Sequence, residues 1–211
     1  MINHNRTLIL APHTDDGEFG CGGSIAKFLE EGADVYYAAF SICEESVPNG
    51  CPNDIIEKEL KRAAKVLGIQ KSNLLIYKYP VRHFAEHRQD ILEDLVQLQR
   101  TLKPTVVFMP SINDLHQDHN ILAQEGLRAF KKTTILAYEM PWNNINFATQ
   151  LFIKLGKRHV DVKTAALKEY ESQKDKLYAS ESFIRSLSHT RGVSVDTEYA
   201  EAFEVVRCVI E

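Results

Sequence analysis

The chain has 211 residues, of which 44% are hydrophobic, and this suits one domain with a substantial core. Lys and Arg number 25 against 29 Asp and Glu, and no long basic block occurs, so a nucleic-acid-binding surface is not expected. No stretch approaches the roughly 18 apolar residues of a membrane span, which excludes an integral membrane protein of the helical kind.

The N-terminus and the cysteines favour a reducing compartment. Residues 1–6 are polar and lead into a short apolar run, without the longer apolar core of a signal peptide. The four cysteines form neither a CxxC pair nor a dense framework, which is typical of free thiols. They are Cys21, Cys43, Cys51 and Cys208. We therefore expect a cytoplasmic protein.

Short β-branched runs alternate with longer amphipathic segments, a pattern typical of βα units around a mostly parallel sheet. The predicted strands are residues 7–11, 35–40, 73–77, 105–109 and 134–138. Helices are predicted over residues 23–31, 55–67, 88–102 and 120–130, where apolar side chains recur at three- and four-residue spacing. Gly32 and Gly68 follow two of these helices, where a left-handed cap would fit. The fold expected for residues 1–211 is a single-domain, Rossmann-like three-layer α/β sandwich.

The alternation of predicted strands and helices ends after Tyr138. Residues 140–153 are aromatic, rich in Asn and poorly periodic, so we interpret them as an excursion near the active site. Two helices are predicted near residues 162–172 and 180–188, followed by a final strand around residues 202–210.

The first chemical cluster, His13-Thr14-Asp15-Asp16-Gly17-Glu18, directly follows the first predicted strand. Ligands of an open α/β sheet gather at the carboxyl ends of its strands. A glycine-rich turn can also cradle a phosphate, but a His and two adjacent carboxylates favour a cation instead. His13 and Asp16 can both point at one ion, leaving Asp15 beside a bound water. The alternative is a turn in which Asp15 or Asp16 caps the next helix.

A second cluster, His116-Gln117-Asp118-His119, follows the strand predicted at residues 105–109 and precedes a helix. Two clusters beyond the carboxyl ends of strands can converge at one edge of the sheet. Asp118 lies between the two histidines and can orient an imidazole through its second nitrogen. The alternative is a solvated helix start capped by Asp118 or Asn120. Together, the two clusters favour a metal site.

These two clusters resemble the two signatures of the PIG-L/LmbE-like deacetylases, a family of metal-dependent N-deacetylases that act mostly on N-acetylglucosamine-type groups. The resemblance covers nearly the whole chain. It implies that His13, Asp16 and His119 bind the metal, that Asp15 is the general base, and that His116 faces the reacting carbonyl. The metal is expected to be zinc, with ferrous iron possible in the cell. A homo-oligomer is also expected.

The expected mechanism uses a dication that lowers the pKa of a water from about 15.7 towards about 7. Asp15 then takes the proton of this water as it attacks the amide carbonyl. Protonated His116, held by Asp118, stabilises the developing oxyanion. The partner is a small N-acetylated sugar or its conjugate.

Candidate substrate-binding residues are Glu18, Arg82 and Trp142. The family's commonest first motif is His-Pro-Asp-Asp-Glu, whereas here Gly17 takes the glutamate position and Glu18 follows it. Many relatives carry an Arg where this chain has Ile56, so a substrate-binding arginine is expected elsewhere. We assign that role to Arg82, with Arg88 as a second candidate. Trp142, the only tryptophan, can pack against a sugar face, although a core or oligomer contact would also explain it.

Two other interpretations remain open. One is a different metal-dependent amidohydrolase, acting on a thiol-cofactor precursor or a nucleotide-linked sugar. The other is a non-catalytic metal- or nucleotide-binding α/β module, which predicts nucleotide binding without metal and gives Asp15 no role.

Overall fold

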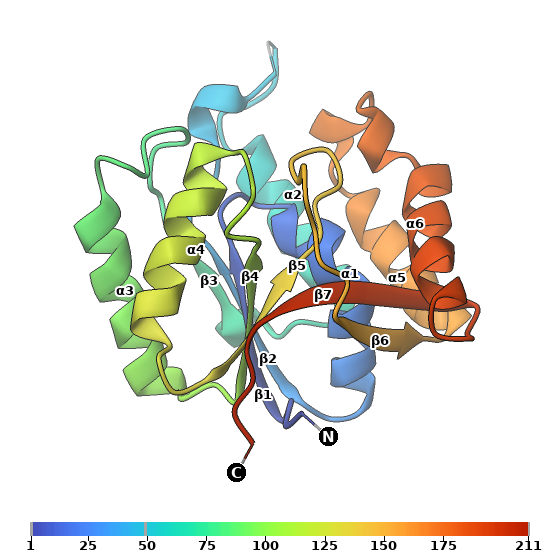
Figure 1. Cartoon of the computed structure of the whole chain (residues 1–211). Helices are drawn as coiled ribbons and strands as arrows, with labels where there is room; N and C mark the ends of the chain where they lie inside the picture. Colours follow the sequence, from blue (N-terminus) through green and yellow to red (C-terminus); the bar gives the residue numbers. More distant parts are fainter. Residues whose placement is uncertain (1, 49, 211) are drawn as a thin grey trace.

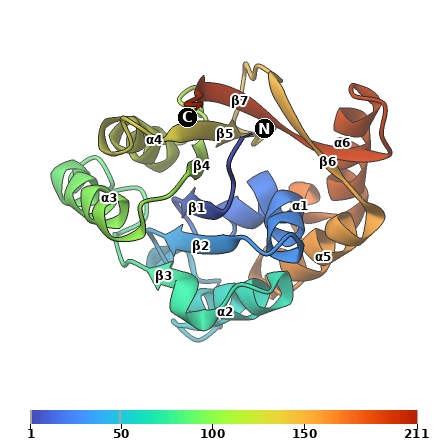
Figure 2. The ribbon, with the colours of Figure 1, turned by 90° about the horizontal axis from the view of Figure 1, so that it is seen from below.

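The computed structural model describes residues 2–48 and 50–210 as a seven-stranded sheet in the order β3-β2-β1-β4-β5-β7-β6, between two helical layers (Figures 1 and 2). The strands are β1 (Arg6–Ala11), β2 (Asp34–Ala39), β3 (Leu74–Ile76), β4 (Val106–Pro110), β5 (Thr134–Tyr138), β6 (Leu151–Leu155) and β7 (Tyr199–Arg207). Strands β1 to β5 pair in parallel, whereas β7 runs antiparallel to β5 and β6. The predicted single α/β domain with a mostly parallel sheet is confirmed.

The helices pack as two groups on opposite faces of the sheet (Figure 2). One face carries α1 (Asp16–Glu30), α2 (Ile55–Leu67), α5 (Lys157–Leu167) and α6 (Glu181–Val193), and the other carries α3 (Arg88–Leu102) and α4 (Gln117–Ala129). Each face has its own apolar core, built around Phe108 and Tyr138 on the first and around Phe84 and Phe130 on the second. Strand β1 is buried on both faces because it is a central parallel strand.

Helix α1 begins seven residues earlier than the pattern predicted. Its first turns contain four glycines, which lower helix propensity and mask the amphipathic period. These glycines serve close packing: a Cβ on Gly17 would overlap the Tyr37 ring, and one on Gly20 would overlap Tyr138. Tertiary packing thus holds a helix that local propensity does not favour, with a kink at Cys21.

The segment after β5 was predicted only in part. Residues 140–150 form the expected excursion, but Leu151–Leu155 is strand β6, which pairs with β7 at the edge of the sheet. Helix α5 also begins at Lys157, five residues before the predicted start. Gly32 and Gly68 have φ of 84° and 93°, as their positions after helices predicted. Among the described residues, none of the helices is both long and apolar enough to cross a bilayer.

Candidate metal centre

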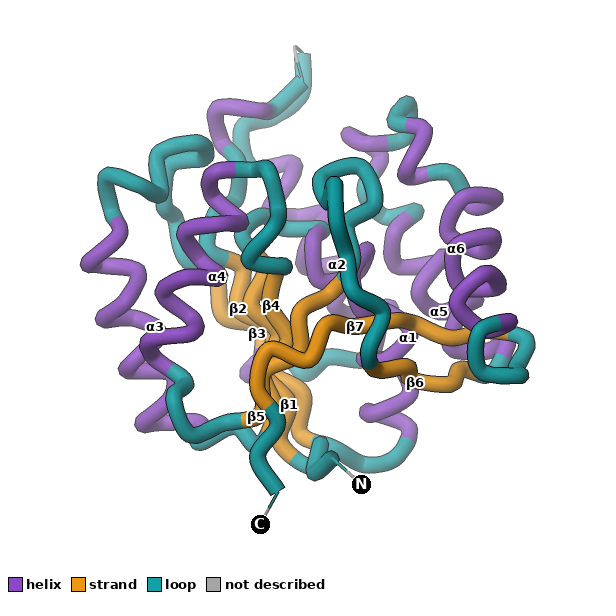
Figure 3. Tube along the Cα trace, viewed as in Figure 1, coloured by secondary structure: helices purple, strands orange, loops and turns teal. Residues whose placement is uncertain are grey.

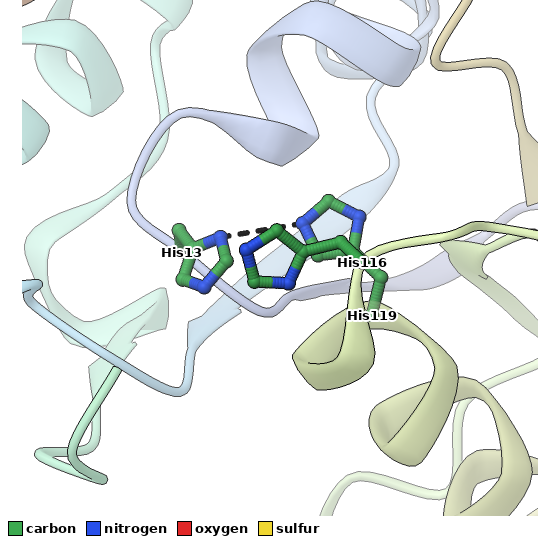
Figure 4. Close-up of side chains that lie close together, drawn as sticks. All are labelled: His13, His116 and His119. Carbon is green, nitrogen blue, oxygen red and sulfur yellow. Dashed lines mark hydrogen bonds between the residues drawn. The ribbon is translucent and has the colours of Figure 1, made fainter. Parts of the chain in front are cut away.

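The two chemical clusters meet at the carboxyl ends of β1 and β4. These strands are parallel neighbours, with Thr7 opposite Val106 and Ile9 opposite Phe108, so the loops that follow them leave the sheet side by side. Figure 3 shows loops gathering at this end of the sheet. Figure 4 shows the imidazole of His13, from the loop after β1, converging with those of His116 and His119, from the start of α4.

Three donor atoms form a nearly equilateral triangle at this point. His13 Nδ1 lies 3.3 Å from Asp16 Oδ2, and His119 Nε2 lies 3.2 Å from Asp16 Oδ2 and 3.2 Å from His13 Nδ1. A tetrahedral ion with ligands at about 2.0–2.1 Å has donor atoms about 3.3 Å apart. The spacing therefore fits one small ion bound by these three residues, and a third imidazole, His116, lies within the same group.

The outer nitrogens of the two histidines already have carboxylate partners. His13 Nε2 lies 3.0 Å from Asp118 Oδ2, and His119 Nδ1 lies 2.8 Å from Asp114 Oδ2. When these nitrogens donate, the inner nitrogens of neutral rings carry lone pairs. Three acceptors then face one another, an arrangement that requires a cation or added protons between them.

The pKa values of His13, His119 and Asp16 agree with the need for positive charge between the three donor atoms. Burial lowers the pKa of His13, but hydrogen bonds to Asp118 and Asp16 outweigh it and raise the pKa to about 9. Burial likewise opposes the charge of His119, yet Asp16 and Asp114 raise its pKa to about 10. Although burial acts in the opposite direction, His119 and His13 hold the pKa of Asp16 well below its usual range.

Asp15 lies at the N-terminus of α1 and lines the cavity above the three donors. Its carboxylate makes no capping hydrogen bond, and the Asp16 carboxylate accepts a bond from the His13 backbone N–H at 2.8 Å, so neither caps the helix through its side chain. Burial and the neighbouring Asp16 raise the pKa of Asp15 to about 7. A carboxylate with a pKa near neutrality is suited to accept and return a proton.

Asp118 and His116 interact differently from the prediction. The Asp118 carboxylate contacts His13 and accepts the backbone N–H of Arg82 at 2.6 Å, rather than holding His116. His116 is instead the N-cap of α4, and its Nδ1 accepts the Asp118 backbone N–H at 3.2 Å, so neither Asp118 nor Asn120 caps this helix. Burial, followed by His13 and His119, lowers the pKa of His116. With its Nδ1 accepting this hydrogen bond, the His116 ring can donate through Nε2 only, unlike the imidazolium expected to be held by Asp118.

The assignment of Glu18 to substrate binding is wrong. Its side chain is fully buried behind the first loop and contacts the hydroxyl groups of Tyr37 and Tyr170. Burial raises the pKa of Glu18 to about 8. Both tyrosines also lie within hydrogen-bonding distance of the Thr14 carbonyl, at 2.9 and 2.7 Å. Glu18 therefore supports the loop that carries Asp15 and Asp16 and does not face substrate.

The donors open into a cavity of about 290 Å³. Its walls come from the loops at the carboxyl ends of the strands and from the first turns of α1, α2 and α4, and its lining includes Phe19, Ser46, Ile56, Val81, Trp142, Asn143, Gln173 and Tyr178. Trp142 stacks on Tyr178 with ring centroids 4.3 Å apart. A larger hollow of about 420 Å³ lies near the N-terminal ends of β1 and β4, and its described lining contains none of the predicted site residues.

The two predicted arginines pair with carboxylates outside the lining of this cavity. The Arg82 guanidinium lies 3.4 Å from Glu45, half exposed, and only its backbone N–H reaches the site, through Asp118. Arg82 adopts a left-handed φ of 71°, which turns this N–H toward the carboxylate. The Arg88 side chain contacts Glu125 on α4. Neither side chain lines the cavity, so the structure gives no support to a substrate-binding role for either.

Sequence reasoning missed several residues of the site. Asp114 lies two residues before the second cluster, and only the fold shows that it bonds His119 and the backbone N–H of His116. Gln173 and Tyr178 lie in short 3₁₀ turns that no periodic pattern marks. Cys43, at φ 53°, also lines the cavity, and burial raises the pKa of its thiol.

Comparisons with known proteins agree with this site. A family model described as PIG-L, GlcNAc-PI de-N-acetylase, matches residues 8–130. The chain is 30% identical over 171 residues to YaiS, an uncharacterised deacetylase of Escherichia coli, covering 78% of this chain and 90% of that one. It is 24% identical to a diacetylchitobiose deacetylase of Thermococcus kodakarensis, covering 95% of this chain and 83% of that one.

Solved structures share the fold. A conserved protein of Thermus thermophilus has a TM-score of 0.81 at 26% identity, covering 98% of this chain and 96% of that one. A 4-carboxy-2-hydroxymuconate hydratase of Pseudomonas putida has a TM-score of 0.79 at 18% identity, covering 98% of each chain, so the fold alone does not fix the reaction. The family match covers more than half of the chain and includes both clusters. This chain belongs to the PIG-L family of de-N-acetylases.

Proposed function

We propose that the protein is a metal-dependent hydrolase that removes the acetyl group from an N-acetylated amino sugar or its conjugate. The observation that carries the proposal is the triangle of His13 Nδ1, Asp16 Oδ2 and His119 Nε2, with sides of 3.2–3.3 Å. Deacetylases of diacetylchitobiose and, by description, of an N-acetylglucosaminyl malate are among the relatives, which supports an acetylated sugar as substrate.

These three residues would hold the metal, which we propose to be zinc because two imidazoles and one carboxylate suit it, with ferrous iron as the alternative. When bound, such an ion supplies an acidified water and a positive charge for the carbonyl oxygen. Asp118 and Asp114 fix the orientation and tautomer of His13 and His119.

The remaining steps belong to the side chains around the donors. Asp15 takes the proton as water oxygen bonds to the carbonyl carbon, and it returns this proton to the amine nitrogen as the C–N bond breaks. Neutral His116 presents its Nε2–H to the oxygen on which negative charge develops. Free amine and acetate are the products.

The test is acetate release from a panel of N-acetylated sugars, nucleotide sugars and glycosides, with protein loaded with zinc and with protein stripped by chelator. We expect release only from the loaded protein, and recovery when zinc is restored. The His119→Ala variant should neither bind zinc nor release acetate. Zinc-loaded protein that releases acetate from no member of the panel would overturn the proposal, and nucleotide binding without metal would favour the binding-module interpretation.

A further inference from the structure

The described walls of the active-site cavity contain no basic side chain other than imidazole. Among the described residues that line it, none is Lys or Arg, and the carboxylates are Asp15 and Asp16. Phosphate and carboxylate groups are usually bound by guanidinium or ammonium groups in such sites. The cavity therefore lacks the ordinary means of binding an anionic substituent.

Arginines close to the site in the fold are paired elsewhere. Arg82 pairs with Glu45 at 3.4 Å outside the cavity, and Arg88 pairs with the buried Glu125 on α4. Arg191 donates to Glu139 through two of its nitrogens. Moving any of these guanidinium groups to a ligand would break an ion pair. Moving Arg191 would leave the buried Glu139 without this partner, and moving Arg88 would leave the buried Glu125 paired with Arg128 alone.

The electrostatic balance of the site also opposes an anion. Asp16 supplies one of the three donor atoms, Asp15 lines the cavity beside it, and Asp114 and Asp118 contact the outer nitrogens of His119 and His13. A phosphate in a cavity of about 290 Å³ would lie close to the carboxylate oxygens of Asp15 and Asp16 and be repelled.

The rest of the lining suits uncharged groups. Trp142 stacks on Tyr178, and the edge of Phe19 meets both rings, with centroids 5.3 and 5.5 Å away. Aromatic surfaces of this kind pack against the C–H faces of a sugar ring. Asn143 and Gln173 also line the cavity, and a side-chain amide can both donate to and accept from a neutral hydroxyl group.

We propose that the substrate is uncharged: a neutral N-acetylated amino sugar or a neutral glycoside of one, rather than a phosphorylated, nucleotide-linked or carboxylate-bearing sugar. This inference rests on the proposed function and narrows its substrate class. Ile56 and Ser46 both line the cavity and carry no charge. A cation introduced at either position should therefore change this selectivity.

The first test compares three substrates with the zinc-loaded enzyme: methyl N-acetyl-β-glucosaminide, N-acetylglucosamine 6-phosphate and UDP-N-acetylglucosamine. We expect kcat/KM for the neutral glycoside to exceed the values for both anionic substrates by about tenfold or more, with the gap narrowing in high salt. Equal or higher kcat/KM for either anionic sugar would overturn the inference while leaving the deacetylase function intact. Acetate from none of the three or of the wider panel would instead remove the proposed function.

Adding a cation to the wall should change this preference. The Ile56→Arg variant should raise kcat/KM for the 6-phosphate by about tenfold relative to the neutral glycoside. Ser46→Arg is a second variant at an exposed cavity position, in case the buried Ile56 does not tolerate the longer side chain. Val66→Arg is the matched control, because it adds the same charge to α2 at an exposed position outside the cavity lining. A preference unchanged in both cavity variants, with folding intact, would contradict the inference.

A binding measurement separates recognition from turnover. Trp142 is the only tryptophan and lines the cavity, so its fluorescence reports occupancy. In zinc-loaded Asp15→Ala, which should bind substrate without cleaving it, the neutral glycoside should change the emission at concentrations about tenfold lower than the 6-phosphate. The reverse order would refute the uncharged-substrate inference even if turnover were slow.

Discussion

Replacing Asp114 by Asn tests whether the outer carboxylates tune the donor triangle. Asp114 is 4% exposed, its Oδ2 lies 2.8 Å from His119 Nδ1, and its Oδ1 accepts the His116 backbone N–H at 2.8 Å. Both oxygens are therefore acceptors. An amide offers one oxygen, so in Asp114→Asn its NH₂ group must face one of two N–H donors.

The expected magnitude follows from this mismatch. Loss of a carboxylate partner to a metal-binding histidine weakens metal affinity by about 10- to 100-fold, which corresponds to about 1.4–2.8 kcal/mol. The unpaired buried donor should also lower the free energy of unfolding of the metal-free protein by about 1–3 kcal/mol.

Zinc affinity is measured by competition with a chromophoric chelator, and the free energy of unfolding by urea titration of the metal-free protein. Asp34→Asn is the control, because Asp34 lies at the amino end of β2, far from the loops, and its ion pair with Arg6 spans 3.9 Å at an exposed surface. Zinc affinity of Asp114→Asn within about threefold of the wild type would refute the assigned role of this carboxylate.

Three further predictions concern the donors and the loop after β1. Asp15→Asn should retain zinc, measured by metal analysis, while kcat falls by about 10²- to 10⁴-fold; loss of metal in parallel with activity would contradict its role as base. Zinc affinity should rise with pH between about 6 and 8. The reason is that His13 and His119 have pKa values of about 9 and 10 and must release about two protons when zinc binds. Calorimetry in buffers of different ionisation enthalpy counts these protons. Glu18 has a pKa raised to about 8, so its contribution to the free energy of unfolding is present at low pH and is lost as pH rises toward 8. In Glu18→Gln the free energy of unfolding should fall less steeply with pH over this range, and activity should be kept. An equally steep fall in the variant would show that another group causes it.

Much of the fold was predictable because local signals and tertiary packing agree over most of the chain. Strand β5 and helices α2 and α3 have the bounds expected from periodicity alone. The start of α1 was missed because glycines in close contact with Tyr37 and Tyr138 weaken the helical pattern. Strand β6 was missed because it is a short edge strand whose pairing with β7, such as Leu151 opposite Phe203, joins distant parts of the sequence and leaves no local pattern.

The candidate site was predictable to the level of its two clusters, but not to the level of its hydrogen bonds. The positions of the clusters after β1 and β4 indicated that they would meet, because neighbouring parallel strands end at one edge. Which imidazole Asp118 contacts depends on the first turn of α4, where His116 becomes the N-cap and Asp118 turns toward His13. Sequence spacing does not encode that choice.

The burial of Glu18 shows a similar limit. A carboxylate two residues after Asp16 is adjacent to the site in sequence, but the helical turn directs it to the opposite side, toward Tyr37 and Tyr170. The selectivity of the cavity could not be predicted from the sequence either, because Gln173 and Tyr178 lie in short turns that only the fold brings close to the donor atoms.

The cavity is assembled from two separate stretches of the chain. The proposed metal ligands and base lie between His13 and His119, within the matched residues 8–130, whereas Trp142, Gln173 and Tyr178 come from the part that follows β5. Mutations in that later part can therefore alter which sugar fits without disturbing the atoms that carry out the hydrolysis. Such a division allows the aromatic part of the wall to drift in one stretch, while the residues proposed to carry out the reaction are inherited unchanged in the other.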